Sequence, residues 1–548
     1  LGDGVTTGGG IISGSIVNDG SLILNRPEDH AFNNLITGGG SVEKAGTNTV
    51  TFGTSNLAGS LAITGGKLVV NGGGSLTGIV SGAGQLEVAG GTLSLSGFDA
   101  NTNTGLVTVS AGLLRLEKNA DTLAVGGDIT ITGTGAVTIV SNEQVPNTAT
   151  INVFGSSVDS LLNSIGTETF ANANVNGTPE VQLLLRNFST ITGTATVTQG
   201  LLGVASNHTG TVNALAMTSP TALIRVSGNT AASVMNIGTG GITASGGEIQ
   251  VKYNGNNQDA TLNLAGGVAT TGNLNITNGG YAGASLNVIN LSDGAHTFNI
   301  GTGTTTNIAP DMGGTGSLLK TGTGTMTLDV NNTAAHTGGT TVSQGLLLVN
   351  GALQGTTDVS AAGTIGGNGT LAGATTVAGT VAPGVATGKL TTSAGITLGA
   401  GSKLAIDVAS WTGTGAGTDW DLLAADTLTL AATSGNKLTI RVAGTPAGFT
   451  ESAKTLTIAT SANPLVGFDA SAIAIDSTGF TGTGTWTVQK TGETLELVYA
   501  TTGGTPYSTW ATANNLDGTN SAPALDPDKD GSPNFLEFAV NGVPLSGT

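Results

Sequence analysis

The chain has 548 residues, of which 91 are glycine and only 9% are Asp, Glu, Lys or Arg, and its formal net charge is −18. The acidic balance argues against a basic face for phosphate backbones, so nucleic acid is not an expected partner. The absence of cysteine excludes disulfides and thiolate metal sites. Aromatic residues are only 4%, whereas apolar residues are 38% and strongly patterned, so we expect a thin core spread along an axis.

The chain begins at Leu1 without Met and without a charged-then-apolar leader. No run approaches the roughly 18 apolar residues of a membrane span. This start is typical of an exported protein whose leader has been removed. We therefore expect an extracellular or bacterial cell-surface protein with no membrane span.

Short alternating apolar runs, bounded by Gly, Asn and Thr, fill residues 10–500. Such runs predict short strands separated by turns, and helical periodicity is nearly absent before residue 500. Four examples are Ser21–Leu24, Lys67–Val70, Thr92–Leu95 and Leu346–Val349.

The clearest repeat lies over residues 260–300, where apolar–Asn–apolar triplets recur every twelve residues. In a strand, the two apolar side chains share one face and the Asn takes the other, so stacked triplets predict an aliphatic stack and an Asn ladder. Two units of about twelve residues make a coil of about 24, which favours a parallel β-helix over a meander of antiparallel hairpins. The triplets are Leu262-Asn263-Leu264, Leu274-Asn275-Ile276, Leu286-Asn287-Val288 and Phe298-Asn299-Ile300.

Residues 313–384 contain GGTGSLLKTGTGTMTL, then TGGTTVSQGLLLVNG, then a Gly/Thr/Val ladder that ends at Pro383-Gly384. This order resembles the passenger-associated repeat of bacterial autotransporter-type proteins. A fainter copy covers Gly38–Gly53, and residues 396–430 resemble the segment that commonly follows the repeat. The resemblance implies a secreted, right-handed parallel β-helix at the surface of a Gram-negative-type bacterium, and it implies no catalytic activity.

The composition changes near residue 500, after a last predicted strand over Glu493–Tyr499. We expect a β-solenoid over 1–500, a linker over 501–506 and a small C-terminal module over 507–548. The module carries aromatic residues that are scarce elsewhere, and two short helices are predicted in it. These helices are expected over Tyr507–Leu516 and Asn534–Val540.

Residues 526–537, DPDKDGSPNFLE, gather carboxylates in a chain with little charge. Their spacing matches the twelve-position calcium loop, in which Gly531 would permit the sharp turn. Ca²⁺ takes about six to eight hard oxygens, whereas Mg²⁺ prefers fewer protein ligands in stricter octahedral geometry. The alternative is an acidic, solvated loop without a metal. The expected Ca²⁺ ligands are Asp526, Asp528, Asp530, the carbonyl of Ser532, Asn534 and the bidentate Glu537.

A calcium sensor requires a pair of calcium-binding loops, and this chain has a single one. We therefore expect the loop to stabilise a small terminal module. The order Tyr507, Trp510, Asn514 and Leu516, followed by the loop, resembles C-terminal EF-hand- or dockerin-like segments of secreted proteins from Verrucomicrobia- and Planctomycetes-like bacteria. That resemblance covers about 40 residues and implies an exported protein.

Catalysis would need two carboxylates that face each other about 5–10 Å apart across a cleft. The pairs Asp419/Asp421 and Glu493/Glu496 are close in sequence, but we interpret both as exposed acidic positions. Lys and Arg are too sparse to suggest a lyase base. The four histidines are widely separated and are predicted to be surface residues rather than a metal site: His30, His208, His296 and His336.

The sequence therefore predicts an all-β, calcium-stabilised structural protein and not an enzyme. The glycine-rich N-terminus offers no evident cap for the end of a solenoid, so we expect head-to-tail self-association into a fibre or surface layer. One alternative is an adhesin-type passenger that binds surface glycans. The other is a carbohydrate-active β-helix enzyme.

Overall fold

The computed structural model describes residues 1–2, 4–7, 12–155, 161–178, 181–205, 207–227, 231–251, 259–278, 287–329, 336–501 and 506–546. The chain forms a parallel β-solenoid of about 16 turns, and strands account for 53% of it. In the described part of the chain the only α-helices are two short ones near the C-terminus. The predicted all-β parallel solenoid is therefore confirmed.

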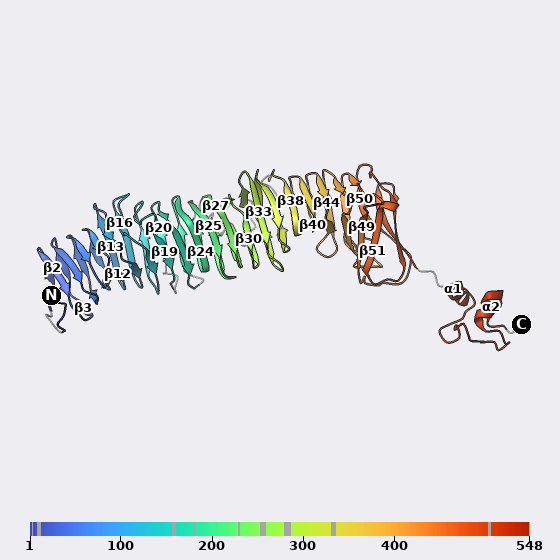
Figure 1. The fold of residues 1–548 in the computed structure, drawn as a ribbon, viewed down its shortest axis with the longest axis horizontal. Helices are drawn as coiled ribbons and strands as arrows, with labels where there is room; N and C mark the ends of the chain where they lie inside the picture. Colours follow the sequence, from blue (N-terminus) through green and yellow to red (C-terminus); the bar gives the residue numbers. More distant parts are fainter. Residues whose placement is uncertain are drawn as a thin grey trace. The chain divides into compact units, whose positions relative to one another are not determined.

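The chain divides into two compact units. Unit 1 comprises Leu1–Thr380 with Thr391–Ala394, and unit 2 comprises Val381–Leu390 with Gly395–Thr548. In unit 1 the strands follow one another in chain order along one axis (Figure 1), and every pairing whose register is described is parallel. One of its sheets consists of β2 (Ser21–Asn25), β5 (Ser41–Ala45), β8 (Leu61–Ile63), β11 (Val80–Gly82) and β14 (Thr102–Asn103).

The alternation of apolar and polar residues sets which side chains enter the solenoid. In β29 (Ala260–Leu264), Leu262 and Leu264 are at most 1% exposed, whereas Asn263 between them is half-buried on the outer face. β29 pairs in parallel with β32 (Asn287–Leu291), so the aliphatic side chains stack from coil to coil. The four example strands are likewise confirmed within β2, β9 (Lys67–Val70), β13 (Thr92–Gly97) and β38 (Thr340–Val349).

Asparagine ladders run along the outside of unit 1, as expected. Nδ2 of Asn263 donates to Oδ1 of Asn236 at 2.8 Å, and Nδ2 of Asn290 donates to Oδ1 of Asn263 at 3.0 Å. Each step spans 27 residues. A shorter ladder joins Asn152 and Asn174 over 22 residues. The ladder is therefore real, but its period is that of the local coil.

The predicted 24-residue register over 260–300 is wrong. Asn275 was expected to stack on Asn299, but it instead accepts from Asn307, 32 residues along the chain, at 2.9 Å. Val288 pairs with Thr261, and Leu286 lies outside the described residues. Turns between strands differ in length from coil to coil, so a twelve-residue spacing in sequence does not fix which strands stack.

The two copies of the family-like motif share a buried lysine. Lys44 in β5 and Lys320 in β36 (Ser317–Thr321) are both 0% exposed. Each ammonium donates to the carbonyls of its next two residues and to one carbonyl on the following coil, Gly65 for Lys44 and Gln344 for Lys320, at 2.8–3.0 Å. Burial lowers the pKa of Lys320 to about 8. The motif lysine thus ties adjacent coils together from the inside.

Unit 2 ends its strand-rich part differently from unit 1. Here β53 (Thr494–Ala500) pairs antiparallel with both β50 (Lys454–Ser461) and β52 (Thr485–Thr491). An aromatic cluster lies beside these strands, with ring centroids 4.9–6.2 Å apart. Its members are Trp411, Phe449, Phe480, Trp486 and Tyr499.

Two helices follow the strands, α1 (Pro506–Ala513) and α2 (Asn534–Val540). The predicted helix over Asn534–Val540 is confirmed, whereas the first helix ends three residues earlier than Leu516. Residues 502–505 of the expected linker lie outside the described residues. In the part of the chain that the structure describes, no helix is long and apolar enough to cross a membrane.

Candidate metal site

The candidate site lies in the terminal module, residues 506–546, where a long loop joins α1 to α2. Four aromatic rings hold the two helices together, with centroids 5.6–6.1 Å apart. The hydroxyl of Tyr507 also donates to the carbonyl of Ser521 at 2.9 Å, which fixes the first part of the loop against α1. The four rings are Tyr507 and Trp510 from α1, and Phe535 and Phe538 from α2.

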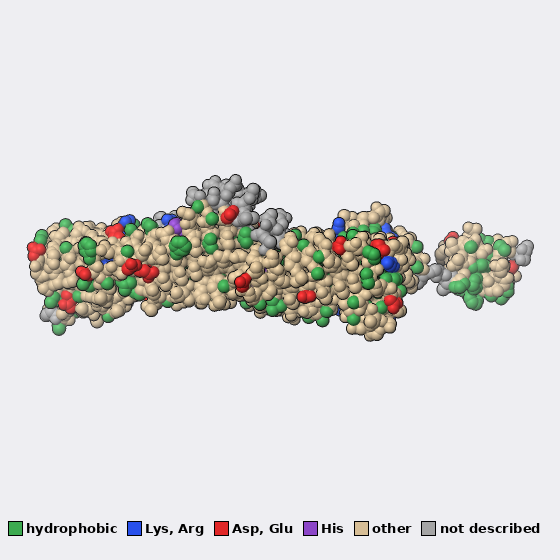
Figure 2. Space-filling view, turned by 90° about the horizontal axis from the view of Figure 1, so that it is seen from above, with side chains coloured by type: hydrophobic (Ala, Val, Ile, Leu, Met, Phe, Trp, Pro, Cys, Tyr) green, Lys and Arg blue, Asp and Glu red, His purple; other side chains and the backbone are tan. Residues whose placement is uncertain are grey.

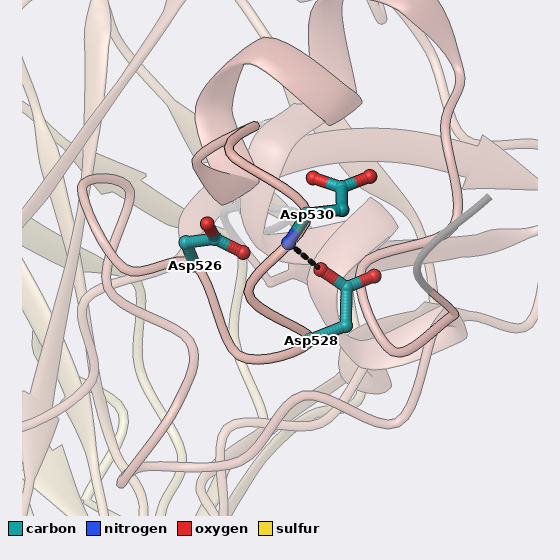
Figure 3. A group of neighbouring side chains, drawn as sticks. All are labelled: Asp526, Asp528 and Asp530. Carbon is teal, nitrogen blue, oxygen red and sulfur yellow. Dashed lines mark hydrogen bonds between the residues drawn. The ribbon is translucent and has the colours of Figure 1, made fainter.

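The backbone of residues 526–532 curls around its own carboxylates. Gly531 has φ +94°, a left-handed conformation that favours glycine, as the calcium-loop pattern requires. Its amide donates to Oδ2 of Asp526 at 2.9 Å, and the amide of Asp530 donates to Oδ1 of Asp528 at 3.3 Å (Figure 3). The amide of Ser532 donates to Oδ1 of Asp530 at 2.8 Å. Each aspartate therefore uses one oxygen to shape the loop.

The three loop aspartates form a cluster that can hold a cation. One ligand atom from each of Asp526, Asp528 and Asp530 lies within 4.8 Å of the others. Oδ1 of Asp526 and Oδ2 of Asp528 are shielded from solvent and have no hydrogen-bond partner in the described structure. Shielded carboxylate oxygens without a donor are costly unless a cation compensates them.

Glu537, in the first turn of α2, lies near the three aspartates but outside the group whose ligand atoms are within 4.8 Å of one another. Its side chain is 4% exposed, and its Oε2 is a further shielded oxygen without a hydrogen-bond partner in the described structure. Burial raises the pKa of Glu537, and the charges of Asp528, Asp530 and Asp526 raise it further. The three aspartates thus oppose the charge on Glu537, and a divalent ion would offset that repulsion. The residues present fit a hard metal ion.

Asn534 has a structural role that the sequence pattern did not predict. It is 0% exposed, and its Nδ2 donates to the carbonyls of Asn520 and Ala522 at 2.7 and 3.0 Å. The side chain therefore fastens the segment after α1 to the start of α2. Its Oδ1 has no hydrogen-bond partner in the described structure and stays available as the predicted ninth ligand.

The histidine prediction is wrong for two of the four residues. His296 and His336 are 1% and 0% exposed, whereas His30 and His208 are half-buried. Both ring nitrogens of His296 lie 2.8 and 3.0 Å from backbone carbonyl oxygens, and Nε2 of His336 lies 2.8 Å from another. Burial lowers the pKa of His336. These buried rings hold backbone carbonyls of turns in unit 1.

The prediction of an exposed acidic strand is wrong for Asp421, which is 1% exposed. Its carboxylate accepts the amides of Gly388 and Asp407, both at 2.8 Å, and burial raises its pKa to about 7. Asp419 lies in a turn and accepts the amide of Gly415 at 2.8 Å. Both carboxylates are used to hold local backbone rather than to face each other.

The second acidic pair lies at the edge of β53. Glu493 is exposed, as predicted, and its carboxylate lies 3.7 Å from Lys490. Glu496 is half-buried and accepts from Gln489 on β52 at 2.8 Å. The Gln489–Glu496 contact is a cross-strand pair, whereas Lys490 and Glu493 lie close across the turn between β52 and β53.

Sequence reasoning missed a buried carboxylate in unit 1. Glu168 is 0% exposed and accepts the amides of Gln144 and Val145 at 2.6 and 3.3 Å. Burial raises its pKa to about 8. A single glutamate among polar residues gives no sequence signal for this position. The buried lysines could have been found, because both occur at the same place in the repeated motif.

The fold and the carboxylate cluster define a parallel β-solenoid protein with a helix–loop–helix module able to hold a metal ion. No known family model matches the chain, and no curated protein matches it significantly.

Proposed function

We propose that the protein is an extracellular structural solenoid whose terminal module binds Ca²⁺ and which associates with copies of itself. The observation that carries the calcium part is the cluster of Asp526, Asp528 and Asp530. Asp526, Asp528 and Glu537 each also have a shielded oxygen without a hydrogen-bond partner in the described structure. These oxygens belong to a loop whose backbone already has the curled form that such an ion requires.

Calcium fits the donor set better than other divalent ions. The ligands available are carboxylate and amide oxygens, and the chain has no cysteine to bind softer metals. Four carboxylates and an asparagine oxygen supply the high coordination number of Ca²⁺, whereas Mg²⁺ usually keeps several waters. When bound, the ion would neutralise the loop and fasten it to α2.

The structural part rests on how unit 1 uses its polar residues. Its buried polar groups, such as Lys320, Glu168 and His296, bind backbone within the solenoid. Its outer Asn side chains bond to one another in ladders. Among the described residues, the loop aspartates are the only cluster with metal-ligand geometry. The resemblance of residues 313–384 to autotransporter-type repeats supports export and surface display.

Calcium binding is tested by calorimetric titration of the full chain. Wild type is expected to bind one Ca²⁺ per chain, and Glu537→Gln is expected to bind it on the order of 100-fold more weakly, because a charged ligand is lost. Asp358→Asn, which removes an exposed carboxylate from β40 (Thr357–Gly367), is the charge-matched control and should bind as wild type. Equal binding by wild type and Glu537→Gln would refute the site.

Self-association is tested by light scattering and negative-stain microscopy of the full chain in Ca²⁺ and in EGTA. Mass that rises with protein concentration, with fibres or sheets in the images, is expected in Ca²⁺. A monodisperse monomer in both buffers would refute this part of the proposal.

A further inference from the structure

Arg186, which follows β23 (Gln182–Leu185), has a guanidinium without an ion pair in the described part of the chain. Its side chain is half-buried, and its Nε is shielded from solvent and has no hydrogen-bond partner among the described residues. Two other arginines of unit 1, Arg26 and Arg115, instead contact glutamates at 2.6 and 3.0 Å. A shielded guanidinium without an acceptor is costly, and a bound anion would compensate it.

His208, on the next coil, supplies a second nitrogen donor near Arg186. Its Nδ1 accepts the amide of Asn187 at 3.2 Å, so the ring proton is on Nε2, which has no partner among the described residues. Burial lowers the pKa of His208, and the charge of nearby Arg186 lowers it further, so the ring is neutral at pH 7. Basic side chains are sparse on this chain, and Figure 2 shows one at the surface beside a histidine.

Phe188 keeps its ring in solvent at a conformational cost. It is 72% exposed and has φ +59°, and Asn187 before it has φ +46°. Asparagine tolerates this left-handed conformation, whereas an aromatic residue rarely adopts it. The amide of Ser189 donates to the carbonyl of Arg186 at 3.0 Å, and the hydroxyl of Thr167 donates to the next carbonyl at 2.9 Å. These bonds maintain a strained turn that presents an aromatic ring to solvent, which indicates a binding surface.

Polar groups beside this turn are also available. Asn207, which precedes His208, is exposed, and its side chain has no hydrogen-bond partner among the described residues. Glu168 on the preceding coil does not pair with Arg186, because its two oxygens accept backbone amides of the coil before it. Four side chains on two successive turns are here called the Arg186 corner: Arg186, Phe188, Asn207 and His208.

We propose that the Arg186 corner binds one carboxylate-bearing sugar unit of an acidic saccharide. The guanidinium would hold the carboxylate through two parallel N–H···O bonds, and the apolar C–H face of the sugar ring would lie on the ring of Phe188. Nε2–H of His208 and the side-chain amide of Asn207 would bind its hydroxyls. This site goes beyond the proposed structural role and depends neither on Ca²⁺ nor on self-association.

The charges of the chain limit which anions fit the corner. A nucleic acid would bring many phosphates to a chain with a net charge of −18 and only 16 Lys and Arg residues, which would repel it. A small anion such as acetate would satisfy Arg186 but leave Phe188 in water. An acidic sugar unit brings one carboxylate together with an apolar ring face and hydroxyls, so it matches all four side chains. Because few groups contact it, a single unit is expected to bind with a Kd on the order of 1 mM.

The test is a ligand-observed NMR titration of the full chain with the methyl glycosides of galacturonic and glucuronic acid. The neutral methyl galactoside and glucoside, and acetate, are the reference probes. Wild type is expected to bind at least one acidic sugar about tenfold more tightly than its neutral counterpart and than acetate. Arg186→Gln and Phe188→Asn should each weaken that binding about tenfold. The control is Phe98→Asn, which removes an 82% exposed ring next to Asp99 and should bind as wild type.

Phe188→Asn separates a binding role from a folding role, because asparagine suits the left-handed turn. This variant should unfold at the same temperature as wild type or higher while losing the sugar, and Phe188→Tyr, which keeps the ring, should bind as wild type. Wild type that binds neither acidic sugar would overturn the proposal. Acetate that binds as tightly as the acidic sugars would also overturn it and leave an anion site only. Undiminished binding by Arg186→Gln or by Phe188→Asn would do the same for the role of that residue and for the proposed site.

Discussion

Unit 1 and the terminal module stabilise their backbone in opposite ways. In unit 1, aliphatic side chains such as Leu262 are removed from water on coil after coil, and parallel ladders satisfy the backbone. In the module, the strongly buried apolar side chains are Ala511, Leu516 and Pro544, and three aspartates cluster in a loop near Glu537 of α2. In unit 1, each coil adds a small contribution to the folding stability. In the terminal module, one bound ion would supply most of it.

The two regions also differ in how they compensate buried charges. In unit 1, backbone groups compensate buried charges such as Lys44 and Glu168, and the buried Arg26 is paired with Glu28 at 2.6 Å. The module instead places like charges together. Groups within the chain compensate the first arrangement, whereas a cation from solution would compensate the second.

The largest expected effect is a loss of local stability that is confined to one of the two regions. Leu262→Ala should destabilise its neighbouring coils by about 2–5 kcal/mol, because it leaves a cavity in a thin core. Removal of Ca²⁺ should leave those coils unchanged and expose the backbone of residues 526–540. Hydrogen exchange by mass spectrometry measures both regions in one sample. If Leu262→Ala loosens the module equally, the two regions are not independent and the comparison fails.

A smaller effect is expected on the pH dependence of the stability of unit 1, through Glu168. Its folded pKa of about 8 lies above the ordinary value of 4.5, so its stabilising contribution is full below pH 4.5 and is lost as the pH rises through 8. Wild type should therefore lose a few kcal/mol more stability than Glu168→Gln between pH 5 and 9.

Urea unfolding at several pH values measures this difference for unit 1. Glu43→Gln, a half-buried glutamate on β5, is the matched control and should follow wild type. Parallel pH profiles for wild type and Glu168→Gln would contradict the prediction.

The smallest effect concerns the Asn ladder. Asn263→Ala removes two amide–amide hydrogen bonds and should cost about 1–2 kcal/mol locally, because the ladder is half-buried. Asn299→Ala should cost close to nothing, because Asn299 is exposed and belongs to the twelve-residue pattern but not to the bonded ladder. Exchange rates around β29 and β33 (Ala295–Ile300) distinguish the two. Equal costs would favour the sequence spacing over the observed register.

Much of the fold could be predicted because the signals are local. Alternation placed Leu262 inside and Asn263 outside, and the loop pattern placed the turn at Gly531. The pairing of Asn263 with Asn290 could not be predicted, because turn lengths decide it. The burial of His336 and Asp421 also escaped prediction, since a polar residue gives no sign of whether backbone groups will satisfy it.

By itself, the sequence determined the strand period, the change in composition near residue 500 and the spacing of the carboxylates. These depend on residues close together in the chain, where side-chain alternation and loop length are fixed by geometry. Only the tertiary structure decided which coils stack, which polar groups are buried, and that Asn534 fastens the segment at Asn520 to α2. Those outcomes depend on the lengths of turns and on contacts between distant residues, which no local pattern encodes.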